Sequence, residues 1–301
     1  MHSRLLTYFL VVYTYKSVSV ASEKLRISQP ALTKSIQQLE ASIGVRLFDR
    51  EARGVSATPY ADILARHVRL MDSEYRHALA EIEVVRGGGG GVVSIGAGPV
   101  WYSCLLPPVI AQFTAENPDI RVRVQSGVID TMVPGLRSGQ FDFICTNLDF
   151  PPQSDLATES LIELSHVVVA GVEHPLRRLD RVTAHDMKGY DWVALIDDQV
   201  GTGRILSYYS AHGEPPPKIA VETSSPTQMM ELLSNAPMLG QIPRRMMSLA
   251  QRFGLAPLDT QGAFWRTPSG ICYRHSEHRL PAVSRFLNAL RTSLAAGEGS
   301  A

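Results

Sequence analysis

A group of residues between positions 28 and 37 combines hydrogen-bonding side chains with residue types that begin helices. Its members are Ser28, Gln29, Pro30, Thr33, Lys34 and Gln37. In the major groove of DNA, glutamine can pair with adenine through two hydrogen bonds, and lysine can reach a guanine or a phosphate. An ordinary solvated helix face has the same polarity, so these residue types alone leave two interpretations open.

Apolar spacing predicts that this group occupies one side of a helix. The apolar positions are Leu32, Ile36, Leu39 and Ile43. Their separations of four, three and four residues predict one inward stripe, with the polar side chains on the opposite face. Ser28 can cap this helix, Pro30 is tolerated in its first turn, and Gly44 is expected to end it.

Two earlier helices and a small β-wing are expected around this third helix. The pattern predicts helices at about residues 5–13 and 19–26, and residues 50–58 combine a turn with short extended segments. Arg50 and Arg53 in the wing suit phosphates or a narrow minor groove. Two helices joined by a short turn, the second with a polar outer face, fit the major groove of double-stranded DNA.

A long helix is predicted over residues 59–86, with apolar residues repeating at alternating spacings of four and three. These residues are Leu64, Val68, Met71, Tyr75, Ala78, Ile82 and Val85. The spacing is that of a coiled-coil seam, and the helix would be roughly 40 Å long. The seam can pack on the chain's own body or on a second copy. The five glycines at 87–91 predict a flexible hinge directly after this helix. We favour dimerisation, because so long a helix has little of its own domain beside it to cover the seam.

Beyond the hinge, short β-rich segments alternate with helical ones, which predicts a parallel α/β sheet. The expected strands are 92–97, 120–125 and 141–145, and the expected helices are 105–113, 132–138 and 281–294. Ligands in such folds bind beyond the carboxyl ends of strands. The candidate ligand-binding residues in those loops are Val100, Trp101, Tyr102, Ser103, Thr131, Thr146, Asn147, Thr202, Arg204 and Ser224.

Several of these residues have two possible roles. Ser103 can cap its helix and also offer a hydroxyl to a ligand. Because helix N-termini attract negative charge, this ligand is expected to be an anion. Trp101 and Tyr102 can stack on a ring or pack in the core. Arg204 can pair with a ligand carboxylate or remain in solvent.

Composition indicates a soluble globular chain of more than one domain. The 301 residues are 45% hydrophobic and 19% charged, and no apolar run has the length of a membrane span. Because there is no signal-peptide pattern and the three cysteines have no C-x-x-C spacing, we expect a cytoplasmic protein. Residues 1–60 carry eight Lys and Arg against four Asp and Glu, so a polyanion is expected to dock at this end.

The motifs of common enzyme classes are missing from the sequence. Residues 96–101 and 201–206 begin with Gly-x-Gly but lack the third glycine of a dinucleotide site, and there is no phosphate loop or nucleophile elbow. His275 and His278 have no further metal-ligand pattern around them. We therefore expect no enzymatic activity, no cofactor and no metal.

Five short segments together resemble the N-terminal signature of the LysR-type transcriptional regulators. They are residues 5–12, 21–25, 28–32, 36–40 and 44–50, and the resemblance extends over essentially the whole chain. The sequence departs from the family at Ser22, where an alanine is frequent. It departs again at residues 58–61, where the family often has Thr-x-Ala-Gly.

The resemblance implies an α+β multidomain fold. It comprises a winged helix-turn-helix (1–58), a dimerisation helix (59–86), a hinge (87–91) and an effector module shaped like a periplasmic binding protein (92–295). Subdomain I would cover about 92–163 and 268–295, and subdomain II about 164–267.

The implied function is sequence-specific regulation of transcription, controlled by a small-molecule effector bound between the subdomains. The implied partners are double-stranded DNA, a second copy or three further copies of the chain, and RNA polymerase if the protein activates. A solute-binding module or a thiol redox sensor on the same scaffold is the alternative.

Overall fold

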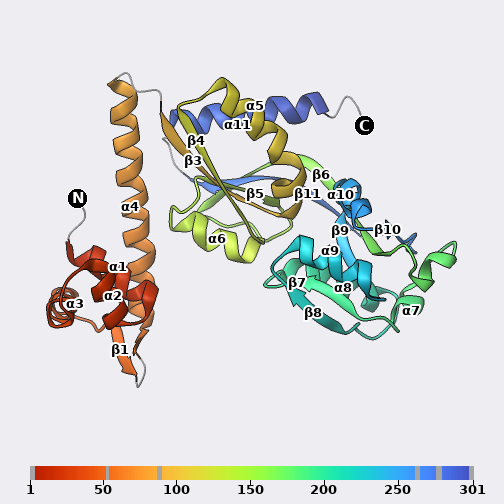
Figure 1. Ribbon diagram of the computed structural model, residues 1–301, viewed down its shortest axis with the longest axis horizontal. Helices are drawn as coiled ribbons and strands as arrows, with labels where there is room; N and C mark the ends of the chain where they lie inside the picture. The colour runs from red at the N-terminus through yellow and green to blue at the C-terminus, as the bar shows by residue number, and fades with distance from the viewer. Residues whose placement is uncertain (1–3, 52–53, 87–89, 262–264, 276–279, 298–301) are drawn as a thin grey trace. The chain divides into compact units, whose positions relative to one another are not determined.

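A computed structural model describes residues 4–51, 54–86, 90–261, 265–275 and 280–297 (Figure 1). The chain divides into two compact units. The N-terminal unit is Met1–Gly88 with Arg137–Gln140, and the C-terminal unit is Gly89–Leu136 with Phe141–Ala301.

Among the described residues, the N-terminal unit contains four helices and a two-stranded wing. They are α1 (Arg4–Tyr15), α2 (Val18–Leu25), α3 (Gln29–Ile43), β1 (Phe48–Glu51), β2 (Gly54–Ala57) and α4 (Pro59–Val85). The turn between α2 and α3 is short because each end is specified locally. Arg26 takes a left-handed conformation after α2, and the Ser28 hydroxyl accepts a hydrogen bond from the Ala31 N–H at the start of α3.

The hydrophobic core of this unit lies between the helices and the wing. Phe9, Leu32 and Leu47 are fully buried in it, with Ile36 and Leu39 beside them. The prediction that Ile43 faces inward is wrong, since its side chain is 44% exposed. The last turn of α3 extends beyond the buried cluster, which includes Leu39 but not Ile43.

Side chains tie the wing and α4 to this core. The Glu40 carboxylate accepts hydrogen bonds from the Leu47 and Phe48 N–H groups at 2.7 and 3.2 Å. The Thr58 hydroxyl donates to the Arg46 carbonyl and accepts from the Ala61 N–H. Thr58 therefore fixes the start of α4 at the place where the sequence departs from the family pattern.

The C-terminal unit is built on a seven-stranded sheet with the order β10-β6-β11-β5-β3-β4, and β9 pairs with β6. The strands are β3 (Gly91–Ala97), β4 (Ile120–Ser126), β5 (Phe143–Asn147), β6 (Leu156–Gly171), β9 (Gly240–Pro243), β10 (Leu255–Pro257) and β11 (Trp265–Arg274). The pairing of β3 with β4 and β5 is parallel, as predicted. β11 is antiparallel to both β5 and β6.

Two lobes share the long strands β6 and β11 (Figure 1). Lobe I contains β3, β4 and β5 with α5 (Leu106–Glu116), α6 (Ile129–Arg137) and α11 (Pro281–Gly297). Lobe II contains the parallel pair β7 (Trp192–Leu195) and β8 (Ile219–Thr223) with α7 (Ala184–Met187), α8 (Gln199–Ala211), α9 (Pro226–Asn235) and α10 (Met247–Arg252). Short helical turns connect these elements, at Trp101–Leu105 before α5, at Pro175–Arg178 before α7 and at Arg244–Met246 before α10.

The cores of the lobes are separate clusters of side chains. In lobe I, Phe286 of α11 packs edge-on against Phe113 of α5 at 4.9 Å between ring centroids. In lobe II, the buried Trp192 indole donates to the Tyr209 hydroxyl at 3.0 Å.

The predicted glycine hinge is shorter than expected at its C-terminal end, because Gly91 pairs with Ile120 as the first residue of β3. Residues 87–89 lie outside the described residues.

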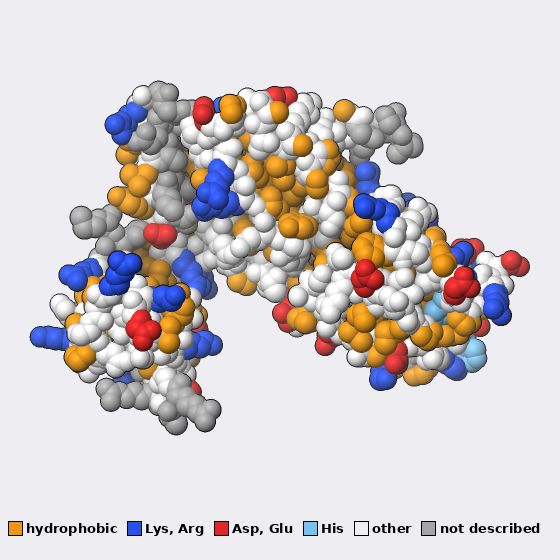
Figure 2. Space-filling model, viewed as in Figure 1, with side chains coloured by type: hydrophobic (Ala, Val, Ile, Leu, Met, Phe, Trp, Pro, Cys, Tyr) orange, Lys and Arg blue, Asp and Glu red, His pale blue; other side chains and the backbone are white. Residues whose placement is uncertain are grey.

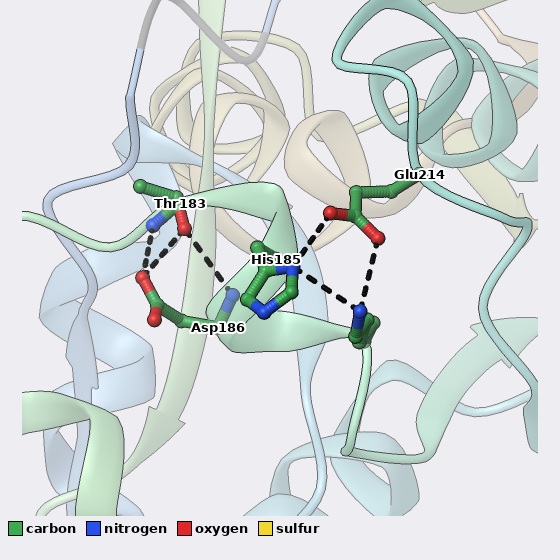
Figure 3. A network of polar contacts seen from close by, with 5 residues as sticks. Thr183, His185, Asp186 and Glu214 are labelled. Atoms are coloured by element: carbon green, nitrogen blue, oxygen red, sulfur yellow. Dashed lines mark hydrogen bonds and ion pairs between the residues drawn. The ribbon is translucent and has the colours of Figure 1, made fainter.

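The short helix α7 is held by polar contacts at both ends (Figure 3). Thr183 and Asp186 form a reciprocal capping box, in which the Thr183 hydroxyl lies 2.6 Å from the Asp186 carboxylate. The Glu214 carboxylate lies 2.7 Å from Nδ1 of His185 and 3.4 Å from Nζ of Lys188. This network anchors α7 to the segment that precedes β8.

Candidate DNA interface and effector cavity

The outer face of α3 presents the polar group that the sequence singled out. Gln29, Pro30, Lys34 and Gln37 are exposed, and Thr33 is half-buried. The Ser28 hydroxyl caps the helix and remains exposed. Lys and Arg side chains are visible around this unit, with fewer Asp and Glu (Figure 2).

Of the two arginines predicted to contact DNA from the wing, the structure describes the backbone of Arg50. Arg50 pairs with Val55 in the β1–β2 ladder. Arg53 lies outside the described residues.

The predicted seam of α4 divides into two parts. Leu64 packs against the core of the N-terminal unit and Val68 is buried, so the first part packs on the chain's own body. The residues Met71, Tyr75, Ala78 and Ile82 are exposed, and Val85 is the last residue of α4. The second part of the seam thus leaves an apolar stripe in solvent.

A cavity of about 810 Å³, including its open mouth, lies between lobes I and II. Lobe I contributes residues 98–101, 128–129, 146–147 and 149–150, and lobe II contributes residues from β7, α8, α9 and β9. Four of the predicted residues line it, namely Val100, Trp101, Thr146 and Asn147. Two more, Thr131 and Ser224, line a smaller neighbouring cavity. Tyr102, Ser103, Thr202 and Arg204 line neither of the two.

Trp101 forms a buried wall of the cavity. Its indole N–H donates to the Ser269 hydroxyl at 2.8 Å, and that hydroxyl donates to the Thr146 carbonyl at 2.9 Å. Because the indole donor is already used inside the protein, Trp101 offers the cavity only an apolar surface. Tyr102, the next residue, is exposed.

The expected capping role of Ser103 is wrong. Ser103 lies inside a π-helical turn, Trp101–Leu105, and the helix α5 begins after it at Leu106. Prolines 107 and 108 occupy the first turn of α5. Since proline has no N–H group, much of the need for a hydroxyl cap is removed.

Arg204 finds its carboxylate within the chain. Its guanidinium donates to Asp149 in the loop after β5, with the Nε atom 3.0 Å from the carboxylate oxygen. This ion pair joins α8 of lobe II to lobe I beside the cavity. Arg204 therefore has neither of its two expected roles, which were to pair with a carboxylate of a ligand or to remain unpaired in solvent.

Four residues of the cavity wall, His166, Asp198, Gln241 and Trp265, were not among the predicted ones. His166 stacks on Trp265 with 4.2 Å between ring centroids. Burial lowers the pKa of His166 to about 4, so its ring is neutral near pH 7. Burial also raises the pKa of Asp198, which the N–H of Gly201 partly offsets.

Only Asp198 had a usable sequence signal, since an aspartate before a helix is typical of an N-cap. The other three come from β6, β9 and β11, and only the long-range pairing of these strands brings them together.

The described residues give no sign of a metal centre or a membrane span. No group of three or more His, Cys, Asp or Glu side chains in the described part of the chain is arranged to hold a metal ion. No described helix is long and apolar enough to cross a membrane.

Comparison with known proteins defines the class of protein and then the family. Residues 3–62 match the family model described as "Bacterial regulatory helix-turn-helix protein, lysR family". Residues 86–295 match the "LysR substrate binding domain". The chain is a helix-turn-helix transcriptional regulator with an effector-binding domain, and it belongs to the LysR family.

Individual relatives agree over nearly the full length. The chain is 29% identical over 298 residues to the HTH-type transcriptional regulator GbpR of Azospirillum brasilense, covering 96% of this chain and 86% of that protein. The crystal structure of CbnR, a LysR family transcriptional regulator, superposes with a TM-score of 0.68 at 19% identity, covering 98% and 99% of the two chains. CbnR in complex with its target DNA gives a TM-score of 0.67 at 20% identity, covering 97% and 100%. These structures confirm the predicted fold class.

Proposed function

We propose that this regulator binds specific DNA sites through α3 and that a small-molecule effector in the cavity between lobes I and II controls its action. The observation that carries the proposal is the cavity itself, which both lobes line and which the Arg204–Asp149 ion pair borders. A ligand that contacts both lobes can stabilise one of their arrangements, provided that it binds this arrangement more tightly than the other.

The DNA-contacting residues of the proposal are those on the outer face of α3 and in the wing. On α3, base edges or phosphates would be contacted by Gln29, Thr33, Lys34 and Gln37. In the wing, the sugar-phosphate backbone of the DNA would be contacted by Arg50 and Arg53. Ser28 and Pro30 would place the N-terminus of α3 near a phosphate. The helix-turn-helix would cover residues 1–58, and the linker helix residues 59–86.

We propose a homodimer formed through the second part of the α4 seam, with a dimer of dimers as its extension. An exposed apolar stripe of this length favours a partner helix in water. Two recognition helices related by a two-fold axis would then contact two half-sites. If the protein activates transcription, RNA polymerase would be a further partner, and binding to the chromosome would place the chain in the cytoplasm.

The structure offers little support for a thiol redox sensor. Cys145 pairs with Ile271 and Cys272 with Ile144 in adjacent strands, so the two thiols point to opposite faces of the sheet. Burial raises the pKa of Cys104, which lowers its thiolate content.

The test is DNA selection from a random pool by the purified full-length chain, followed by titration of the selected site. We expect Lys34→Ala to weaken binding and, if Lys34 contacts a phosphate, to reduce the salt dependence by about one unit of slope. If Lys34 contacts guanine, the base preference changes at one position instead. The matched control is Arg121→Ala, which removes one exposed positive charge from β4 of the C-terminal unit. Equal effects of both changes would refute the assignment of α3.

A further inference from the structure

The charges on the cavity wall restrict the kind of molecule that fits. The described lining residues include the carboxylates of Asp149 and Asp198 but no Lys or Arg. The guanidinium of Arg204, beside the cavity, is ion-paired with Asp149. Because Arg204 offsets the charge of Asp149, an anionic ligand would meet its repulsion mainly at Asp198, for which the described lining residues supply no cation.

At the N-termini of α8 and α9, beside the cavity, three backbone N–H groups already donate to the protein's own side chains. Asp198 caps α8 by accepting from the Gly201 N–H at 3.0 Å, and the Gln199 N–H donates to Asp130 at 3.3 Å. At α9, Ser225 accepts from the Gln228 N–H. These are the donors that would otherwise attract a carboxylate or a phosphate. The expectation of an anionic effector rested on such N-termini, and these three bonds reduce the number of donors that α8 and α9 can offer to an anion.

The wall also holds polar atoms that the described structure leaves without a hydrogen-bond partner. They are Oε1 of Gln241 and Nδ1 of His166, both buried. An amide oxygen can only accept a hydrogen bond, and a neutral imidazole can accept or donate according to its tautomer. A buried polar atom without a partner is costly, so a ligand donor that reaches a reoriented Gln241 carboxamide would remove this cost.

The rest of the wall is mainly apolar. It includes Val100, Ile129, Met229, Met230 and the indole of Trp101, whose N–H is already bonded to Ser269. Resting on the proposed function of the cavity, we propose that its effector is an uncharged molecule with an apolar face that donates a hydrogen bond to Gln241. Carboxylate effectors are then selected against by Asp198.

Three ring compounds of similar size separate charge from hydrogen bonding. Benzamide is neutral and donates, methyl benzoate is neutral without a donor, and benzoate is an anion. Each is titrated against the full-length chain by ligand-observed NMR near neutral pH. We expect benzamide to bind more tightly than methyl benzoate. We expect the Kd of benzamide to be lower than that of benzoate by a factor of about ten or more.

Two substitutions assign these preferences to named groups. Gln241→Leu is expected to remove the advantage of benzamide over methyl benzoate. Asp198→Asn is expected to strengthen benzoate binding relative to benzamide binding, and asparagine keeps the helix cap. Far-UV circular dichroism checks that both variants are folded.

The outcomes separate the ligand class from the site. Benzoate binding as tightly as benzamide, or an undiminished benzamide advantage in Gln241→Leu, overturns the inference about ligand class and leaves the cavity as the site. Val128→Trp fills the cavity from a half-buried wall position and is expected to abolish binding of all three probes. If the probes bind this variant as they bind the parent, or if none binds the parent, the proposed function of the cavity fails.

Discussion

The buried hydrogen-bond chain behind Trp101 provides a quantitative test of how the cavity wall is built. Ser269 is fully buried, accepts from the Trp101 indole and donates to the Thr146 carbonyl. Ser269→Ala therefore leaves a buried indole N–H without a partner and removes a donor from a buried carbonyl. At about 1–3 kcal/mol for an unsatisfied group, we expect the free energy of unfolding to fall by about 2–4 kcal/mol.

A double-mutant cycle isolates the contribution of the indole. In a Trp101→Phe background there is no indole N–H to strand, so Ser269→Ala should cost about 1–2 kcal/mol less than in the parent. Urea unfolding followed by tryptophan fluorescence measures this difference. Trp192 and Trp265 remain in the C-terminal unit to report it. If the cost of Ser269→Ala is the same in both backgrounds, the hydrogen bond does not support the wall as argued.

Three further predictions concern separate parts of the chain. Gly270→Ala should destabilise the C-terminal unit by about 2 kcal/mol or more, because an added Cβ would meet the Glu159 carbonyl oxygen at 2.0 Å; an unchanged urea midpoint would contradict this. Ile82→Asp should shift the proposed dimer towards monomer in analytical ultracentrifugation. Ile63→Asp should not, because Ile63 is equally exposed, at 52% against 53% for Ile82, but lies off the seam; equal shifts would refute the seam. The pKa of His166 is about 4 when buried, below its unfolded value, so the unfolded chain binds more protons and stability falls as the pH drops from 6.5 towards 4. Since this amounts to about 2 kcal/mol between pH 7 and pH 5, His166→Phe should lose less stability than the parent over that range, and equal losses in urea titrations would count against it.

The helix-turn-helix was largely predictable because its signals are local. The cap at Ser28, the stop at Gly44 and the buried stripe all lie within one stretch of 17 residues, and α3 has these ends in the structure. Ile43 was the exception, because periodicity gives the direction of a side chain but not how far the neighbouring core extends. Packing on α3 is decided by α1 and α2, whose contacts the spacing within α3 does not describe.

The cavity was less predictable because its wall is assembled by long-range pairing. Val100 follows strand β3, and Thr146 lies at the carboxyl end of strand β5, so the general rule for parallel sheets located them. His166 and Gln241 line the same cavity because β6 pairs with β9, with Val168 opposite Gln241. Polarity predicted a ligand role for Arg204, but Asp149 is its partner, and no local pattern connects residues so far apart.

The most direct test of the central claim is genome-wide mapping of DNA bound by the native chain and by its Lys34→Ala variant in the source cell. The account predicts discrete sites with two related half-sites about one helical turn, or a multiple of it, apart. It also predicts that occupancy at these sites falls in the variant while the protein level stays the same. The absence of discrete sites for the native protein, or identical maps for the two proteins, would contradict the account of α3 as the DNA-reading element.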